Sequence, residues 1–227
     1  MHITDHDHER VAAAIKAAEA KTSGEIFCVI SRRVSSYRDI RMAWAAAASL
    51  VLPAILIPMG LTGDWFGLGS DWQVAHAAGQ SDDVNRALTA YAIAQALTFI
   101  LVYLASMIPA IGLLMVPQRI RRARVRRVAL QQFMAHGLHA TRDRTGILIF
   151  AAMADHEVEV IADTGIYTRT TPDFWASAVA ALVRGIKAHR PIDGMEAAIA
   201  LCGQALSEHF PPRPDDKNEV PDHLVVL

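Results

Sequence analysis

Two long apolar segments without a charged residue lie in the middle of the chain, and they constrain its fold more than any other feature. The first covers Met42–Leu61 and the second covers roughly Leu88–Val116. A helix rises about 1.5 Å per residue and the hydrocarbon core of a bilayer is about 30 Å thick, so about 20 apolar residues cross it. Both segments are long enough, and we predict that both are transmembrane helices.

The alternative is that these segments are buried core helices of a soluble protein. Hydrophobic residues make up 52% of the chain, its mean hydropathy is +0.23, and the excess is concentrated in the two segments. Prolines interrupt both of them, at Pro53, Pro58 and Pro109. A domain this small would nevertheless have to wrap two helices that are apolar all round, so we favour membrane insertion.

The distribution of arginine predicts the topology. Ten arginines flank the two segments on their outer sides, whereas the loop of residues 62–87 has one arginine and four aspartates. Positive charge near the ends of a span stays in the cytoplasm. We therefore expect a bacterial plasma (inner) membrane protein with two spans, both termini in the cytoplasm and a short acidic external loop. The flanking arginines are Arg32, Arg33, Arg38, Arg41, Arg119, Arg121, Arg122, Arg124, Arg126 and Arg127.

Composition excludes several other classes of protein. A net charge of −1 gives no field that attracts nucleic acid, and we assign Arg119, Arg121, Arg122, Arg124, Arg126 and Arg127 to contacts with the lipid bilayer rather than to RNA. The N-terminal residues show no basic and then apolar pattern, so we expect no cleaved signal peptide. Cys28 and Cys202 lie in apolar runs and are expected to be reduced core residues.

Short helices and strands on both sides of the spans predict one soluble domain that is interrupted in sequence. Before the spans we expect an amphipathic helix over residues 5–21, capped by Thr4 or Asp5, and a central strand Glu25–Ser31. One helix and one strand are too little to bury a core. Residues 1–41 should therefore fold together with residues 117–210, around transmembrane helices 42–61 and 88–116, and a tail follows over residues 211–227.

The second part of the domain is predicted from the following motifs. A basic helix Gln118–Ala140 docks through Leu130, Phe133 and Leu138, and strands Gly146–Met153 and Glu157–Ala162 form an antiparallel hairpin. Thr171-Pro172-Asp173 begins a helix with Phe174, Ala178, Ala181, Leu182 and Ile186 on its apolar face. Asp193-Gly-Met-Glu196 resembles a capping box that opens a helix to His209. Leu224–Leu227 is expected to pack as an extended segment.

Two stretches resemble the TPM domain family. Residues 3–30, ITDHDHERVAAAIKAAEAKTSGEIFCVI, are similar to the opening of TPM domains, and residues 141–166, TRDRTGILIFAAMADHEVEVIADTGI, are similar to their second signature. The resemblance implies a TPM-like α/β/α sandwich with a small β-sheet, here interrupted by a two-helix transmembrane hairpin. It also implies the acid phosphatase activity linked to plant thylakoid members. Many bacterial members have no assigned activity.

Two pairs of residues are candidates for chemistry. Asp143 and Asp163 match acidic positions in the two loops of the family and lie at strand ends, where a shared site for Ca²⁺ or another divalent cation is possible. The alternative is that both aspartates satisfy backbone groups of turns. His136 and His139 would share one helix face and could ligate a metal ion. Ten histidines make chance pairs common, so surface hydrogen bonding is the alternative.

These observations favour a non-enzymatic function. We expect an integral membrane protein whose cytoplasmic TPM-like domain is a protein-interaction or scaffold module, with another membrane or cytoplasmic protein as partner. The alternative is a weak divalent-metal-assisted acid phosphatase that uses Asp143 and Asp163.

Overall fold

The computed structural model describes residues 3–56, 81–170, 175–213 and 218–227. The chain divides into two compact units. Residues 1–36 and 118–227 form one of them, which we name the α/β unit, and residues 37–117 form the helical unit. Sequence segments on both sides of the apolar region therefore build a single α/β body.

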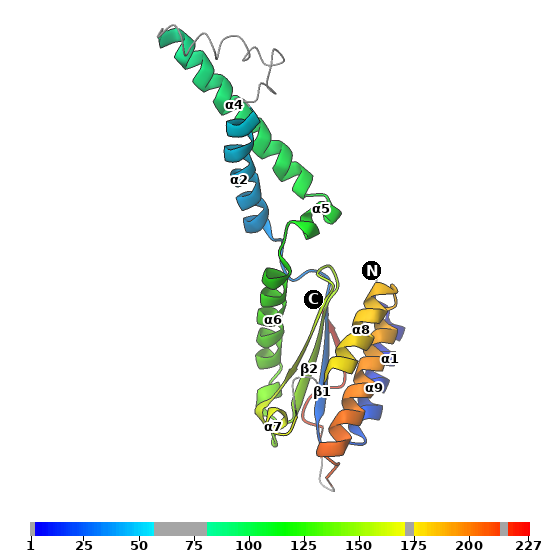
Figure 1. Ribbon diagram of the computed structural model, residues 1–227. Coiled ribbons are helices and arrows are strands. Elements are labelled where there is room, and N and C mark those ends of the chain that lie inside the picture. Colours follow the sequence, from blue (N-terminus) through cyan, green and yellow to red (C-terminus); the bar gives the residue numbers. More distant parts are fainter. Residues whose placement is uncertain (1–2, 57–80, 171–174, 214–217) are drawn as a thin grey trace. The chain divides into compact units, whose positions relative to one another are not determined.

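A mixed sheet lies at the centre of the α/β unit (Figure 1), with strand order β3-β2-β1-β4. β1 pairs in parallel with both β2 and β4, whereas β3 is antiparallel to β2. Every residue of β1 and β2 is buried, which confirms the prediction that Glu25–Ser31 is a central strand. The strands are β1 (Glu25–Ser31), β2 (Gly146–Ala152), β3 (Glu157–Ala162) and β4 (Leu224–Val226).

Helices cover both faces of this sheet (Figure 1). Ile26, Cys28 and Ile30 point into the core formed with α1 (Asp5–Glu19), α8 (Ala176–Lys187) and α9 (Pro191–His209). The alternate residues Phe27 and Val29 pack in the core on the other face, against α6 (Gln118–Ala135). The period of two along β1 is the reason that one strand serves two cores.

Both cysteines are free and buried, as predicted. Burial raises the pKa of Cys202 to about 12, and burial also raises the pKa of Cys28 above its usual value. Neither thiol is a reactive thiolate at neutral pH.

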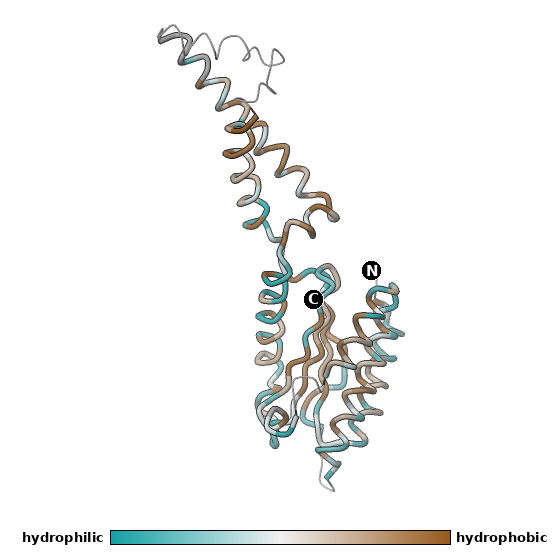
Figure 2. The backbone as a smooth tube through the Cα atoms, in the orientation of Figure 1, coloured by the Kyte–Doolittle hydropathy of each residue, from teal (hydrophilic) through white to brown (hydrophobic). Residues whose placement is uncertain are grey.

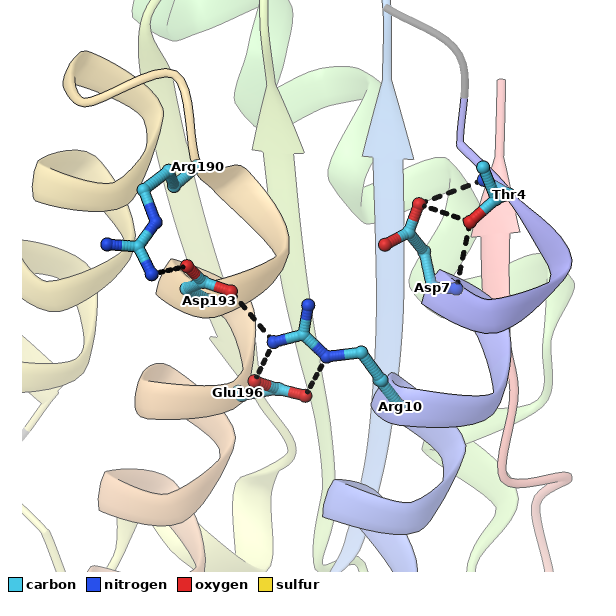
Figure 3. A network of polar contacts seen from close by, with 6 residues as sticks. All are labelled: Thr4, Asp7, Arg10, Arg190, Asp193 and Glu196. Carbon is cyan, nitrogen blue, oxygen red and sulfur yellow. Dashed lines mark hydrogen bonds and ion pairs between the residues drawn. The ribbon is translucent and has the colours of Figure 1, made fainter.

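The first helix is held at its start and along its length. Thr4 forms a capping box with Asp7, and Val11, Ile15 and Ala18 make the buried stripe that the sequence predicted. Figure 3 shows the polar contact to α9, in which the Arg10 guanidinium donates to Glu196 at 3.0 and 2.6 Å and to Asp193 at 2.7 Å. Hydrogen bonding to Glu196 and Asp193 raises the pKa of Arg10.

The capping box predicted for the last helix is wrong. α9 begins at Pro191, with Arg190 as its N-cap residue and no side-chain cap. Asp193 and Glu196 lie inside the helix and bind Arg10 instead (Figure 3). The predicted end at His209 is confirmed.

The helix after the apolar region is shorter than predicted. α6 ends at Ala135, because Gly137 adopts a left-handed conformation with φ 72° and begins a separate 3-10 turn, η2 (Leu138–Ala140). Of the three predicted docking residues, Phe133 and Leu138 are buried, whereas Leu130 is exposed. Val125 and Ala129 are buried as well.

The remaining predicted elements are close to those found. Gly146–Met153 is one residue longer than β2, and the hairpin to β3 is antiparallel as predicted. The apolar face of α8 contains Ala178, Ala181, Leu182 and Ile186. The predicted start signal Thr171-Pro172-Asp173, like Phe174, lies outside the described residues. The predicted extended tail is confirmed by β4, which pairs with β1.

The helical unit contains two long apolar helices that pack against each other. The stretches Arg38–Leu56 and Leu88–Ser106 are long and apolar enough to cross a membrane, and Figure 2 shows their hydrophobic colouring. The second apolar segment is not one helix to Val116, because α4 ends at Ser106. The helices of this unit are α2 (Arg38–Leu56), α4 (Ser81–Ser106) and α5 (Pro109–Leu114).

Candidate functional site

One edge of the sheet brings together five acidic side chains of the α/β unit. β1 and β2 are parallel and both begin there, β3 runs the other way and ends there, and β4 begins beside β1. Residues that precede or follow these strands therefore meet, although they are far apart in sequence. We name this region the acidic edge, and its members are Glu19, Glu25, Asp143, Asp163 and Asp222.

Three of these carboxylates line one cleft of about 340 Å³, between the end of α1 and the start of β4. Glu19 Oε1 accepts a hydrogen bond of 2.7 Å from the backbone N–H of Ile26. Glu25 Oε1 accepts one of 3.2 Å from the N–H of Glu219. Asp222 accepts from the side-chain amide of Asn218. The cleft thus joins the first strand to the C-terminal segment.

The electrostatics of this cleft favour a proton on Glu19. Burial, with the like charges of Glu25 and Asp222 beside it, raises the pKa of Glu19 to about 9. A side-chain hydrogen bond with Asp222 raises the pKa of Glu19 further. A carboxyl group whose pKa is strongly raised inside a cleft is typical of functional sites.

The two aspartates nominated from the sequence lie in adjacent loops of the acidic edge. The N–H of Gly165, in the loop after β3, donates to the carbonyl of Arg144, in the loop before β2, at 3.1 Å. Asp163 is 6% exposed, and its Oδ1 caps the short helix α7 (Thr164–Tyr167) by accepting from Thr164 N–H at 2.6 Å. Asp143 forms an ion pair with Arg213 from the C-terminal segment.

The structure therefore brings the two loops together but gives each carboxylate its own structural partner. The Oδ2 atom of Asp163 is buried and has no hydrogen-bond partner among the described residues. Within the same residues, no group of three or more His, Cys, Asp or Glu side chains is arranged to hold a metal ion.

Hydroxyl groups fasten the loops of the acidic edge. Thr145 Oγ1 donates to the carbonyl of Ser23 at 3.0 Å, and Thr22 Oγ1 donates to that of Phe210 at 2.7 Å. The first contact joins the loops before β1 and β2, and the second joins the loop before β1 to the end of α9. These buried contacts hold the loops of the acidic edge to one another and to the end of α9.

The histidine pair predicted for one helix face is not on a helix face. Gly137 ends α6 between the two residues, so His136 follows the helix and His139 lies in the 3-10 turn. His136 stacks on Phe27, with ring centroids 4.3 Å apart, and its Nε2 contacts Gln132 Oε1 at 3.2 Å. The prediction that His136 and His139 share a helix face is wrong, because the left-handed Gly137 separates them.

The arginines predicted to contact the bilayer divide into two groups. Four of them contact other residues of the α/β unit. Arg122 pairs with Glu157 and Arg126 with Glu159. Arg124 donates to Ser35 Oγ and Arg121 to the carbonyl of Asp155. For Arg119 and Arg127 no ion pair with another described residue is found.

Sequence reasoning missed Glu19, Glu25 and Asp222. One signal was available, because Glu25 is a charged residue at the first position of a strand that is otherwise apolar on both faces. Nothing in the sequence placed Asp222 beside it, since β4 is three residues long and pairs with a strand almost 200 positions earlier.

The comparisons with known proteins support the fold alone. No protein-family model matches this chain, and no curated protein matches it either. Among solved structures, the NMR structure of the BA42 protein from the psychrophilic bacterium Bizionia argentinensis is similar, with a TM-score of 0.57 at 17% sequence identity. The match covers 100% of this chain and 97% of that one.

Proposed function

We propose that this chain is a two-span protein of the bacterial inner membrane whose α/β unit, a TPM-like sandwich in the cytoplasm, is a non-enzymatic protein-interaction or scaffold module. The observation on which this rests is the exposure of the two apolar helices. Only 17% of the residues in the apolar window of Arg38–Leu56 are buried, and 0% of those in the window of Leu88–Ser106.

A core helix of a soluble protein would be mostly buried. Here large side chains such as Leu50, Ile93 and Leu101 are at least half exposed, and complete transfer of such a side chain out of water gains about 1.5–3 kcal/mol. A bilayer supplies that environment on all sides of a helix pair. Arginine is concentrated before the first span and after the second, and this distribution supports a cytoplasmic position for the α/β unit.

The contacts of the nominated aspartates favour a structural role for them. Asp163 caps α7 and Asp143 binds Arg213, which are ordinary uses of aspartate in loops. The hydroxyl contacts that fix these loops provide a rigid surface, which suits recognition of another protein.

One observation favours the second candidate function, a weak divalent-metal-assisted acid phosphatase. Carboxylates from both ends of the chain gather at a single sheet edge, and hard divalent cations such as Ca²⁺ prefer oxygen ligands. Asp143 and Asp163 would then hold the cation and the phosphate ester.

The membrane topology is tested with introduced cysteines, since both native cysteines are buried. The variant Glu208→Cys, whose position is exposed near the end of α9, is treated with a membrane-impermeant maleimide in intact spheroplasts and after lysis. We expect labelling only after lysis, and retention of the protein in membranes washed with carbonate. Labelling in intact spheroplasts, or release by carbonate, contradicts the proposal.

The two functions are separated by an assay of the detergent-purified protein on a generic phosphate ester, with and without Ca²⁺ or Mg²⁺. The scaffold proposal predicts no turnover above that of a mock purification. Turnover that is lost in Asp143→Asn and Asp163→Asn but kept in Asp5→Asn favours the phosphatase. Asparagine retains the capping ability of Asp163, so loss of activity in that variant does not follow from unfolding.

A further inference from the structure

The helix α6 has apolar residues on two opposite sides. Val125, Ala129 and Phe133 are buried against the sheet. On the other side of the helix lies a second row of five residues, which are separated by three, four, three and four positions. This row, which we name the outer row of α6, consists of Ile120, Ala123, Arg127, Leu130 and Met134. Residues at these intervals share one helix face.

The C-terminal half of the outer row is exposed among the described residues of the α/β unit. Leu130 is 42% exposed and Met134 is 55% exposed. Together with Ala123, Arg126, Arg127 and Gln131 they line a shallow depression of about 650 Å³ on the surface of the helix. A helix that only supported the sheet would show polar residues here.

All the charged residues of α6 itself are positive. α6 contains six arginines and no acidic residue. Arg122 and Arg126 are partly neutralised by Glu157 and Glu159 of β3. Arg119 and Arg127 form no ion pair with a described residue, so their charge is available to an external anion.

These charges decide which occupant fits. A second copy of the helix would bring like charges together along its whole length, which opposes self-association. An anionic bilayer surface complements both features, because phosphate groups accept from arginines while apolar side chains enter the acyl boundary. Only three residues separate the end of α5 at Leu114 from the start of α6 at Gln118, so the chain leads directly from the apolar helices into α6.

We propose that α6 lies along the anionic surface of the cytoplasmic leaflet, with Leu130 and Met134 inserted between lipids and with Arg119 and Arg127 bound to lipid phosphates. This inference rests on the proposed membrane insertion of the helical unit. The inner face of α6 remains packed on the sheet, so the whole α/β unit is held in one orientation on the leaflet. Arginines near such a surface are attracted by its negative potential.

The test uses the full chain in nanodiscs of phosphatidylcholine alone or with phosphatidylglycerol. Met134→Cys is labelled with an environment-sensitive fluorophore, and quenching by spin-labelled lipid is measured. We expect at least a two-fold larger quench with phosphatidylglycerol, reversed by 0.5 M NaCl. The same label at Glu208→Cys is the matched control, and we expect no lipid quenching there.

A pair of charge variants tests the role of the arginines. Arg119→Gln with Arg127→Gln should lower the quench to the level in phosphatidylcholine alone. Arg184→Gln with Lys187→Gln, which removes the same charge from the exposed side of α8, should leave it unchanged.

Three results overturn the inference. One is the absence of quenching in anionic nanodiscs that have incorporated the protein. Another is equal quenching in both lipids, since it removes the electrostatic recognition. The third is protection of the label from aqueous iodide without quenching by lipid, which shows that a protein covers the outer row. Failure of the chain to enter nanodiscs is a separate outcome, and it contradicts the proposed function itself.

Discussion

Glu19, the last residue of α1, accepts a 2.7 Å hydrogen bond from the backbone N–H of Ile26 in β1. This contact places a carboxyl group inside the cleft of the acidic edge, beside Glu25 and Asp222. The first helix and the first strand are therefore joined through the Glu19 carboxyl group, whose ionised form is disfavoured by burial and by the neighbouring carboxylates.

The stability of the protein should fall as pH rises because of Glu19. In the unfolded chain this carboxyl loses its proton near its ordinary pKa of 4.5, whereas burial raises the pKa of Glu19 in the fold to about 9. Between these values the folded state binds more protons. The contribution is full below pH 4.5 and is lost as pH rises toward 9.

Glu19→Gln imitates the protonated side chain and keeps an oxygen for the N–H of Ile26. We expect a melting temperature equal to that of the wild type near pH 5 and a higher one at pH 8–9. Thermal unfolding in detergent across this range is the measurement. A variant that is less stable than the wild type at pH 9 would show that the charged form is the native one.

His136 should give the opposite dependence at acidic pH. Burial, with a smaller effect of nearby His223, lowers the pKa of His136 below its ordinary value of 6.5. The unfolded chain then binds a proton first, so this contribution to stability is full above pH 6.5 and is lost as pH falls below it. We expect His136→Gln to lose less stability than the wild type between pH 7 and pH 5. Equal losses in the two proteins would contradict this assignment.

Helices α1 and α9 touch at Gly203. A Cβ atom at this position would lie 2.6 Å from the Cβ of Ala18 and 3.1 Å from its Cα. Since two backbones must move apart, Gly203→Ala should cost about 1–3 kcal/mol of unfolding free energy, against about 1 kcal/mol gained from helix propensity. Adding Ala18→Gly should restore most of the loss. Gln204→Ala, one position along and exposed, is the control, and chemical unfolding is the measurement.

The elements that were predicted correctly have strong local signals. Glu25–Ser31 is apolar on both faces, and β1 has those bounds. The stripe of Val11, Ile15 and Ala18 follows the helical period. Periodicity reports which side of an element is buried, and it does so without knowledge of the partner.

Two of the errors come from contacts that are distant in sequence, and the third comes from a single glycine. Asp193 and Glu196 have the spacing of a capping box, but Arg10, more than 180 positions away, binds both. The acidic edge was found only in part, since it depends on the pairing of β4 with β1. The extent of α6 was overestimated because one glycine in a left-handed conformation, Gly137, ends it.

The last prediction concerns the second span. Leu101 is 65% exposed and lies in the stretch Leu88–Ser106, whose most apolar 18-residue window has 0% of its residues buried. In a membrane it faces lipid, so Leu101→Arg should cost about 3 kcal/mol of insertion free energy. Leu101→Phe keeps an apolar side chain and should insert normally. Insertion is measured as the fraction retained in carbonate-washed membranes. If Leu101→Arg were retained as well as Leu101→Phe, α4 would not be in contact with lipid, because a guanidinium in the hydrocarbon region has no hydrogen-bond partner to replace water.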